Sequence, residues 1–219
     1  PVTLPASVSL NEIESKKNVQ KYYDFIRTRH SIREFSNREV SKDIIETALY
    51  AAGRAPSGAN HQPWHFVCVN DPSTKSKIRI AAEQEEQAFY AGKAGQEWLN
   101  DLKKIGTDAN KPFLEVAPWL IAIFVERSWQ DKKGGKHKNY YMTESVGIAT
   151  GFLINALHAA GLATLTHTPS PMKFLNEILD QPKNHRPFLL LVVGHPAEKA
   201  TIPAASTKKK SIEEIATFI

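Results

Sequence analysis

Four short apolar runs, separated by segments with helical periodicity, constrain the fold of this chain more than any other feature. The runs cover residues 64–69, 118–125, 162–166 and 188–193. Runs of this length and composition predict buried strands. Strands and helices alternate irregularly, and no early strand leads into a G-x-G-x-x-G turn, which argues against a Rossmann nucleotide-binding fold. We therefore predict an α+β fold in which helices surround a modest mixed central sheet.

Helices are predicted between these strands. A short helix is expected over residues 18–27, and Ser41 is the predicted N-cap of an apolar helical stripe that ends at Gly53. Asp71 opens a further helix. A long apolar helix is expected over residues 140–160.

The long helix and the strand after it form a nearly uncharged stretch that is long enough to span a bilayer. Asn155 and His158 interrupt this stretch, so a core helix or a subunit-interface helix is the better interpretation. Gly147 and Gly151 lie four residues apart and share one face, which lets another helix approach closely. This spacing predicts a helix–helix seam, within the chain or between subunits, while the interruptions at Asn155 and His158 predict no membrane association.

Composition excludes several classes of function. The net charge is +5 over 219 residues, but the basic residues are scattered, so we expect no nucleic-acid binding. Cys68 is the single cysteine and lies in an apolar run, where a buried thiol acting as a small hydrophobe is expected. A chain that forms no internal disulfide favours a reducing, cytoplasmic location. The scattered histidines show no zinc-binding spacing, and no metal site is expected.

The chain has no internal repeat or long linker, so residues 1–219 are interpreted as a single domain. Residues 84–111 are polar and interrupted by glycines, which is typical of a mobile lid. An ordinary surface helical hairpin is the alternative. Residues 201–219 have too little apolar content for a core and are expected to form a C-terminal arm that packs on another subunit.

Two short segments carry candidate chemistry. Arg29 and Arg33 flank Ser31, and their guanidinium groups can bind a phosphate in bidentate fashion. A surface salt-bridge patch is the alternative. Ser57 and Gly58 form a turn in which the absence of a Cβ atom lets backbone amides approach a ligand.

The order and spacing of these segments resemble the FMN-dependent nitroreductase superfamily. The motif Arg-x-Ser-x-Arg at 29–33 is followed by a helix and then by Ala-Pro-Ser-Gly-Ala-Asn-His-Gln-Pro-Trp at 55–64. The resemblance implies a nitroreductase-like fold with FMN at the interface of an intertwined homodimer, where both subunits line each site.

A closer resemblance, to the iodotyrosine deiodinase family, extends from about residue 20 over nearly the whole remaining chain. It is carried by Asp71-Pro72, 77–79, the acidic run that ends at Glu86, Tyr90, Trp98, 101–104, Lys111, 117–118, 140–141, 164–169 and 200–203. The predicted lid matters most here, because relatives within the superfamily differ most in that segment.

The resemblance implies a set of cofactor contacts. The FMN phosphate and ribityl chain would be held by Arg29, His30, Ser31 and Arg33, and the turn would contact the cofactor through Ser57 and Gly58. Thr166, His167 and Thr168 would reach the isoalloxazine, with the Thr168 hydroxyl directed to the flavin N5. Lys209 stands near the phosphate where the family tends to place an arginine, and His30 likewise replaces what is often an arginine.

Glu86 and Tyr90 are four residues apart and face the same side of a helix. Together with the ammonium of Lys111 they match an amino-acid zwitterion. Glu83 and Glu85 are nearby competitors, and plain surface residues are the alternative interpretation. The resemblance implies that Glu86 binds the α-ammonium, that Tyr90 and Lys111 bind the α-carboxylate, and that the backbone amide of Ala59 receives the substrate phenolate.

Three hypotheses of function follow. The favoured one is FMN-dependent reductive dehalogenation of halotyrosines, from 3-iodo-L-tyrosine to L-tyrosine and iodide, by stepwise one-electron transfer with Thr168 and Ala59 as the catalytic contacts. The second is a nitroreductase or quinone reductase that transfers hydride from the same FMN. The third is a non-catalytic flavin-binding or ligand-binding protein, or a basic nucleic-acid binder. The electron donor is not identified by any motif, because no nicotinamide fingerprint is present.

Overall fold

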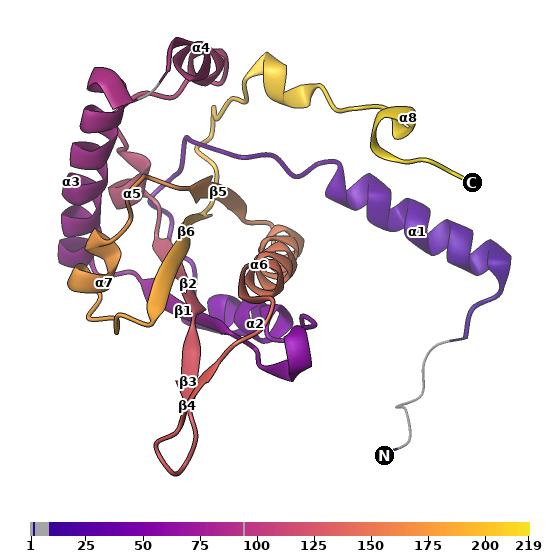
Figure 1. Cartoon of the computed structure of the whole chain (residues 1–219). Coiled ribbons are helices and arrows are strands. Elements are labelled where there is room, and N and C mark those ends of the chain that lie inside the picture. The colour runs from indigo at the N-terminus through magenta and orange to yellow at the C-terminus, as the bar shows by residue number, and fades with distance from the viewer. Residues whose placement is uncertain (1, 3–8, 94) are drawn as a thin grey trace.

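The computed structural model describes residue 2, residues 9–93 and residues 95–219. The chain contains one four-stranded sheet with helices on both faces (Figure 1). The strands are β1 (Trp64–Val69), β2 (Trp119–Glu126), β5 (Ala163–His167) and β6 (His185–Gly194), arranged in the order β1-β2-β6-β5. All four apolar runs are therefore strands, and they form one sheet, as predicted.

The named strands of this sheet pair antiparallel. A mixed sheet was predicted, and among the described residues the one parallel pairing at this sheet is an isolated bridge between Ser31 and Thr164. This bridge lies at the free edge of β5, where the basic segment runs alongside the strand. The sheet thus brings residues 29–33 next to residues 163–167.

The helices are α1 (Glu12–Ile26), α2 (Lys42–Ala52), α3 (Pro72–Ala88), α4 (Gln96–Lys104), α5 (Phe113–Val116), α6 (Met142–Ala159), α7 (Phe174–Ile178) and α8 (Ile212–Ile215). Short turns of other helix types are η1 (Gly58–Asn60), η2 (Phe89–Lys93) and η3 (Ala204–Thr207). Asp71 caps α3 by accepting from the backbone N–H of Thr74 at 2.7 Å. Ser41 and Gly53 bound α2 as predicted, although the Ser41 side chain makes no capping hydrogen bond.

Two apolar cores lie on opposite faces of the sheet because successive residues of β2 point to opposite sides. Ile121, Ile123 and Val125 pack with α2 and α6. Leu120, Ala122 and Phe124 pack with α3, α5 and α7. A strand that is buried on both faces reads as an unbroken apolar run, which explains why the sequence predicted it well. Cys68 packs half-buried against the first core, and burial raises the pKa of its thiol to about 11, so the thiol stays neutral.

Two elements differ from the sequence-based expectations. The first helix begins at Glu12 rather than near residue 18, because Asn11 and Glu14 form a capping box that extends it. The segment after β2, for which no strand was predicted, forms a hairpin of β3 (Ser128–Gln130) and β4 (Lys136–Lys138). Asp131 closes its turn by accepting from the backbone N–H of Gly135 at 2.8 Å.

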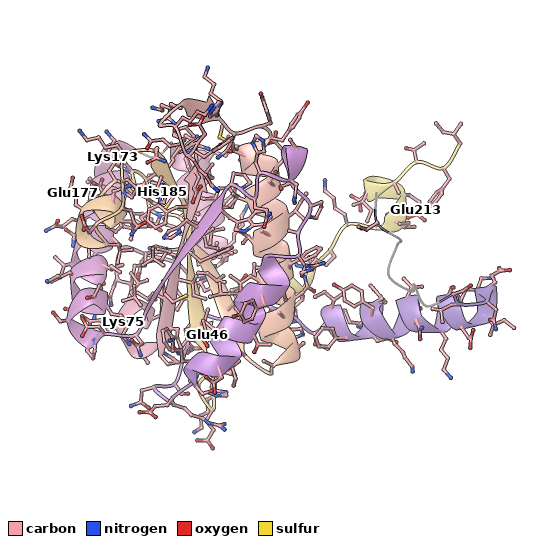
Figure 2. All side chains as sticks on the ribbon, turned by 90° about the horizontal axis from the view of Figure 1, so that it is seen from below. Glu46, Lys75, Lys173, Glu177, His185 and Glu213 are labelled. Carbon is pink, nitrogen blue, oxygen red and sulfur yellow. The ribbon has the colours of Figure 1, made fainter. Side chains whose placement is uncertain are left out.

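Helix α1 and the C-terminal segment with α8 extend away from the body of the molecule (Figures 1 and 2). No residue of α1 or α8 is buried. Gly161, with a φ of +75°, lies just after α6, and the chain then turns into β5. No helix in the described part of the chain is long and apolar enough to cross a membrane.

Candidate active site

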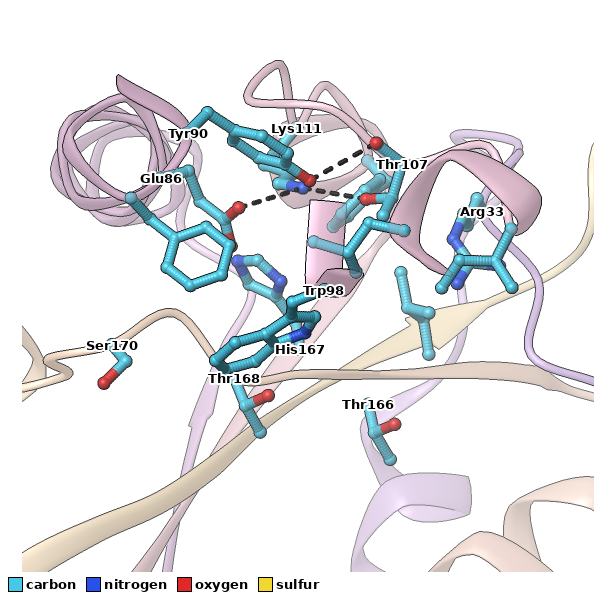
Figure 3. Close-up of a pocket in the computed structure, with 15 residues that line it drawn as sticks. Arg33, Glu86, Tyr90, Trp98, Thr107, Lys111, Thr166, His167, Thr168 and Ser170 are labelled. Atoms are coloured by element: carbon cyan, nitrogen blue, oxygen red, sulfur yellow. Dashed lines mark hydrogen bonds and ion pairs between the residues drawn. The ribbon is translucent and has the colours of Figure 1, made fainter. Parts of the chain in front are cut away.

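A cavity of about 240 Å³ lies between the predicted lid and β5 (Figure 3). We call it the lid cavity; it is lined by Arg33, Glu86, Phe89, Tyr90, Trp98, Leu102, Ile105, Thr107, Lys111, Phe113, Leu165, Thr166, His167, Thr168 and Ser170. Three of the residues predicted to bind substrate, Glu86, Tyr90 and Lys111, therefore meet in one place with several of those predicted to bind cofactor. Of the predicted lid, 84–111, residue 94 lies outside the described residues.

Glu86 and Lys111 form an ion pair inside the lid cavity. Oε2 of Glu86 lies 3.5 Å from Nζ of Lys111, and only 3% of the Lys111 side chain is exposed. Burial lowers the pKa of the Lys111 ammonium, and the charge of Glu86 opposes that shift. A buried ammonium needs a compensating charge and hydrogen-bond acceptors. The Glu86 carboxylate supplies the compensating charge. The pair also holds one anionic and one cationic group at the same cavity.

Tyr90 lies in η2, directly after α3, and it faces the cavity as the spacing from Glu86 predicts (Figure 3). Its hydroxyl donates to the carbonyl of Thr107 at 3.3 Å. Burial, and then the charge of Glu86, raise the pKa of the Tyr90 hydroxyl, so it remains a neutral hydrogen-bond donor. Trp98 packs edge to face on Phe89 with ring centroids 4.9 Å apart, so apolar rings line the cavity beside these polar groups.

The two competing carboxylates, Glu83 and Glu85, do not line the lid cavity as Glu86 does. Glu83 Oε1 accepts from Arg79 Nε at 2.8 Å and from the backbone N–H of Lys111 at 2.7 Å. Glu83 therefore anchors the backbone that carries Lys111. Glu85 does not line the lid cavity.

Residues 166–168 place their side chains alternately on the two faces of the strand and its extension. Thr166 and Thr168 are exposed, whereas His167 is 7% exposed and points to the opposite side (Figure 3). Burial, and then the nearby charge of Lys111, lower the pKa of His167 to about 3, so the imidazole is neutral. Its Nε2 is buried without a hydrogen-bond partner among the described residues. The His167 ring thus lies beneath the lid, away from the two threonine hydroxyls with which it was grouped.

The basic segment runs along the free edge of β5, where the backbone N–H of Ile32 donates to the carbonyl of Thr164 at 3.2 Å. The side chains of Arg29, His30, Ser31 and Arg33 are partly buried. No hydrogen bond or ion pair joins these side chains to another described residue, so a salt-bridge patch is not what this segment forms. Burial lowers the pKa of the Arg33 guanidinium. Partly buried cationic groups without acidic partners fit a ligand that carries phosphate oxygens.

The turn at residues 57–62 is held in a strained backbone conformation. Ala59, Asn60 and Gln62 have φ values of 49°, 57° and 50°, which non-glycine residues adopt at a cost. The backbone N–H of Gln62 donates to Ser57 Oγ at 2.9 Å, which braces the turn. A Cβ atom at Gly58 would lie 2.9 Å from the carbonyl oxygen of Tyr140, so the glycine permits a close backbone approach there. The turn presents Ala59 as an exposed residue.

Within one chain, the predicted site residues remain in separate groups. Ser57, Gly58 and Ala59 do not line the lid cavity. Arg29 and His30 line a second hollow beside His158 and Thr164. Lys209 lies exposed in the C-terminal segment, where its Nζ donates to the carbonyl of Ser206 at 2.9 Å.

Sequence reasoning missed Thr107, which contacts both Lys111 and Tyr90. No signal in the sequence marks this residue, because it follows Gly106 in a non-helical segment and belongs to none of the quoted motifs. Its place in the site is seen only in the folded lid, where Thr107 lines the cavity.

The sequence matches the nitroreductase family over residues 26–195. The chain belongs to the nitroreductase family. The α+β prediction is thereby confirmed, and the match covers every strand of the central sheet and α2 to α7.

More similar relatives narrow this assignment within the family. An iodotyrosine deiodinase from Haliscomenobacter hydrossis is 50% identical over 212 residues, which cover 96% of each chain. Iodotyrosine deiodinase 1 from Homo sapiens is 40% identical over 207 residues, which cover 93% of this chain and 70% of the human protein. The crystal structure of an oxidised iodotyrosine deiodinase bound to FMN and 3-iodo-L-tyrosine has a TM-score of 0.74 and 32% identity, covering 90% of this chain and 99% of that one. The resemblance to the iodotyrosine deiodinase family is confirmed.

Proposed function

We propose that this nitroreductase-family protein is an FMN-dependent oxidoreductase that dehalogenates halotyrosines, converting 3-iodo-L-tyrosine to L-tyrosine and iodide. One observation carries the proposal: Glu86, Tyr90 and Lys111 line the same cavity as Thr166 and Thr168. A carboxylate, a phenol and an ammonium within one cavity match the two charges of an amino acid. The similarity to iodotyrosine deiodinases supports the same substrate class.

The residues of the basic segment fit FMN, because Arg29 and Arg33 offer positive charge that no described carboxylate neutralises, and His30 lies between them. Ser31 would add a hydroxyl donor, Ser57 and Gly58 would approach the cofactor from the turn, and Lys209 would bring a further charge from the arm. Bound FMN would supply the two electrons, one at a time, that together with a proton replace the carbon–iodine bond by a carbon–hydrogen bond and release iodide.

The protein's own groups orient the substrate. Glu86 would take the α-ammonium, while Lys111 and Tyr90 would take the α-carboxylate, so the internal ion pair is exchanged for two pairs with the substrate. Phe89 and Trp98 pack against each other at the cavity wall, and closure of residues 84–111 over the ring would exclude water. The Thr168 hydroxyl would donate to the flavin N5.

The backbone amide of Ala59, in the strained turn, is proposed to bind the substrate's phenolate. A halogen ortho to a phenol lowers its pKa, so a halotyrosine is partly anionic near neutral pH. An N–H group fixed by the φ of 49° at Ala59 would stabilise that anion without reorganisation. Bracing by Ser57 and Gln62 keeps the turn in place.

We propose that the site is completed by a second copy of the chain in a homodimer. Ile148 and Phe152 on α6 are 43% and 42% exposed, and a Cβ atom at Gly151 would meet nothing within 4 Å. A Cβ atom at Gly147 would meet the side chain of Phe188 at 4.0 Å, so no helix of the described residues packs closely on both glycines. A stretch of exposed apolar residues of this kind fits a subunit interface. The exposed helix α1 and the arm at residues 201–219 would pack against the second copy.

We propose that residues 1–219 act as one FMN domain, although residues 1 and 3–8 lie outside the described part. We propose a cytoplasmic location, in line with the neutral, half-buried Cys68, and a separate electron donor that binds without a nicotinamide motif.

A titration of the oxidised holoprotein with 3-iodo-L-tyrosine, followed by flavin fluorescence, tests the proposal. Anaerobic reduction of the complex should then release stoichiometric iodide, measured by ion chromatography. Rapid reduction of nitroaromatics or quinones, with no binding of iodotyrosine, would instead identify a hydride-transferring nitroreductase. A protein that binds no FMN would overturn both.

A further inference from the structure

Thr107 contacts both side chains that are proposed to bind the substrate carboxylate. Its Oγ1 accepts from Lys111 Nζ at 3.0 Å, and its backbone carbonyl accepts from the Tyr90 hydroxyl at 3.3 Å (Figure 3). Thr107 also lines the lid cavity. Thr107 therefore connects the segment before Lys111 to η2, which contains Tyr90.

We propose that Thr107 is a positioning residue for halotyrosine recognition, whose hydroxyl holds the Lys111 ammonium apart from Glu86 and directed to the cavity. This inference rests on the proposed function. Thr107 acts through Lys111, so its effect concerns the zwitterion of the substrate and not its halogenated ring.

The Lys111 ammonium lies closer to the Thr107 hydroxyl than to the Glu86 carboxylate. The ammonium of Lys111 is buried, and it lies 3.0 Å from the Thr107 hydroxyl but 3.5 Å from the Glu86 carboxylate. The hydroxyl thus makes the tighter hydrogen bond, and the ion pair stays loose. Without the hydroxyl, the buried ammonium would move toward Glu86 to recover its lost acceptor.

A tighter Glu86–Lys111 pair would oppose substrate binding. The substrate must bring its ammonium to Glu86 and its carboxylate to Lys111, so binding breaks the internal pair. Any free energy added to that pair in the empty cavity is subtracted from substrate affinity. The Thr107 hydroxyl therefore keeps both charges available.

The contact to Tyr90 is made by the backbone and survives side-chain replacement. At 3.3 Å this hydrogen bond is long, so the Tyr90 hydroxyl can turn to a carboxylate at little cost. A side-chain variant of Thr107 thus isolates the contact to Lys111. Valine keeps the shape of threonine and removes the hydroxyl, whereas serine keeps the hydroxyl.

The test measures binding to the oxidised holoprotein by flavin fluorescence for wild type, Thr107→Val and Thr107→Ser. Two probes are used: 3-iodo-L-tyrosine and 2-iodophenol, which carries the halogenated ring without the zwitterion. Thr107→Val should weaken iodotyrosine binding about tenfold, equivalent to about 1.4 kcal/mol, and leave iodophenol binding unchanged. Thr107→Ser should bind both probes as the wild type does.

A double-mutant cycle with Lys111→Met separates an effect that acts through Lys111 from a general loosening of the lid in Thr107→Val. In the Lys111→Met background, Thr107→Val should cause no further loss of iodotyrosine affinity. An equal loss for both probes, an effect that persists without Lys111, or unchanged iodotyrosine binding in Thr107→Val would each overturn the positioning role. Failure of the wild type itself to bind iodotyrosine would overturn the proposed function, and the role of Thr107 with it.

Discussion

Glu86 and Lys111 lie 25 positions apart in the sequence, yet Oε2 of one is 3.5 Å from Nζ of the other inside the lid cavity. In the proposed complex, the α-ammonium of the substrate would take the place of Lys111 beside Glu86. The α-carboxylate would take the place of Glu86 beside Lys111. The lid cavity therefore carries its own counter-ions, which limits the cost of burying an ammonium that is only 3% exposed.

The first prediction concerns the charge of Glu86. Glu86→Gln should weaken binding of 3-iodo-L-tyrosine by roughly tenfold to a hundredfold, because one charge-assisted hydrogen bond to the α-ammonium is lost. Reduction of a nitroaromatic, which has no ammonium, should be largely retained. Glu85→Gln is the matched control, since Glu85 does not line the cavity. Equal losses for both substrates in Glu86→Gln would contradict the zwitterion assignment.

The second prediction concerns the hydroxyl of Thr168, an exposed residue that lines the lid cavity. Thr168→Ala should slow iodide release about tenfold, the effect of one hydrogen bond of about 1.4 kcal/mol at the reacting centre. Thr168→Ser restores the hydroxyl and should restore the rate. Single-turnover iodide release from the reduced holoprotein checks this. A serine variant as slow as the alanine variant would show that the methyl group, not the hydroxyl, matters.

The third prediction concerns the close approach at Gly58. Gly58→Ala places a Cβ atom 2.9 Å from the carbonyl oxygen of Tyr140, so one of the two backbone segments must shift. We expect a loss of about 1–3 kcal/mol in the free energy of unfolding, with weaker FMN retention. Gly53→Ala is the control, because the nearest atoms lie at an ordinary 3.5 Å. Chemical denaturation and flavin content measure both effects, and equal stabilities of the two variants would count against the tight fit.

The fourth prediction follows from the buried imidazole of His167. Its pKa is lowered to about 3 in the folded protein by burial and by Lys111, whereas an unfolded histidine has a pKa of about 6.5. Between these values the unfolded chain binds a proton that the folded chain does not, so this contribution to stability falls as the pH falls. The slope is about 1.4 kcal/mol per pH unit, and the contribution is constant above about pH 6.5.

His167→Leu removes this titrating group and the buried Nε2 without a described partner. The variant should therefore lose less stability than the wild type on going from pH 6.5 to pH 4.5. Urea unfolding at several pH values measures the difference. Two curves that run parallel through this range would show that His167 does not stay neutral on acidification.

The fifth prediction concerns the proposed dimer. Phe152→Glu introduces a charge on the outward face of α6, where Phe152 is 42% exposed in the single chain. The variant should shift the protein to monomers in analytical ultracentrifugation and lose FMN in parallel, because each site would need both copies. Ile80→Glu, at a residue 55% exposed on α3, is the control and should stay dimeric. A monomeric Phe152→Glu that keeps its FMN would show that one chain completes the cofactor site.

The hydrophobic pattern alone predicted much of the fold. The strand at Trp64–Val69 has the bounds read from the sequence, and the other three strands differ by only a few residues. Such runs are local signals, since a strand covered on both faces must be apolar throughout. The hairpin at β3 and β4 carried no such signal, because two of its three positions on β3 and all three on β4 are exposed.

The sequence by itself determined the order of the strands along the chain, the family motifs and the pairing of Glu86 with Tyr90 on one face, because each depends on residues a few positions apart. Only the tertiary structure decided that Glu83 holds the backbone of Lys111 while Glu86 faces its ammonium. It also placed His167 beneath the lid and set Thr107 between Tyr90 and Lys111. The contact from Glu83 to Lys111 spans 28 positions of the sequence, and the geometry of this set depends on how the lid packs against β5, which no local periodicity encodes.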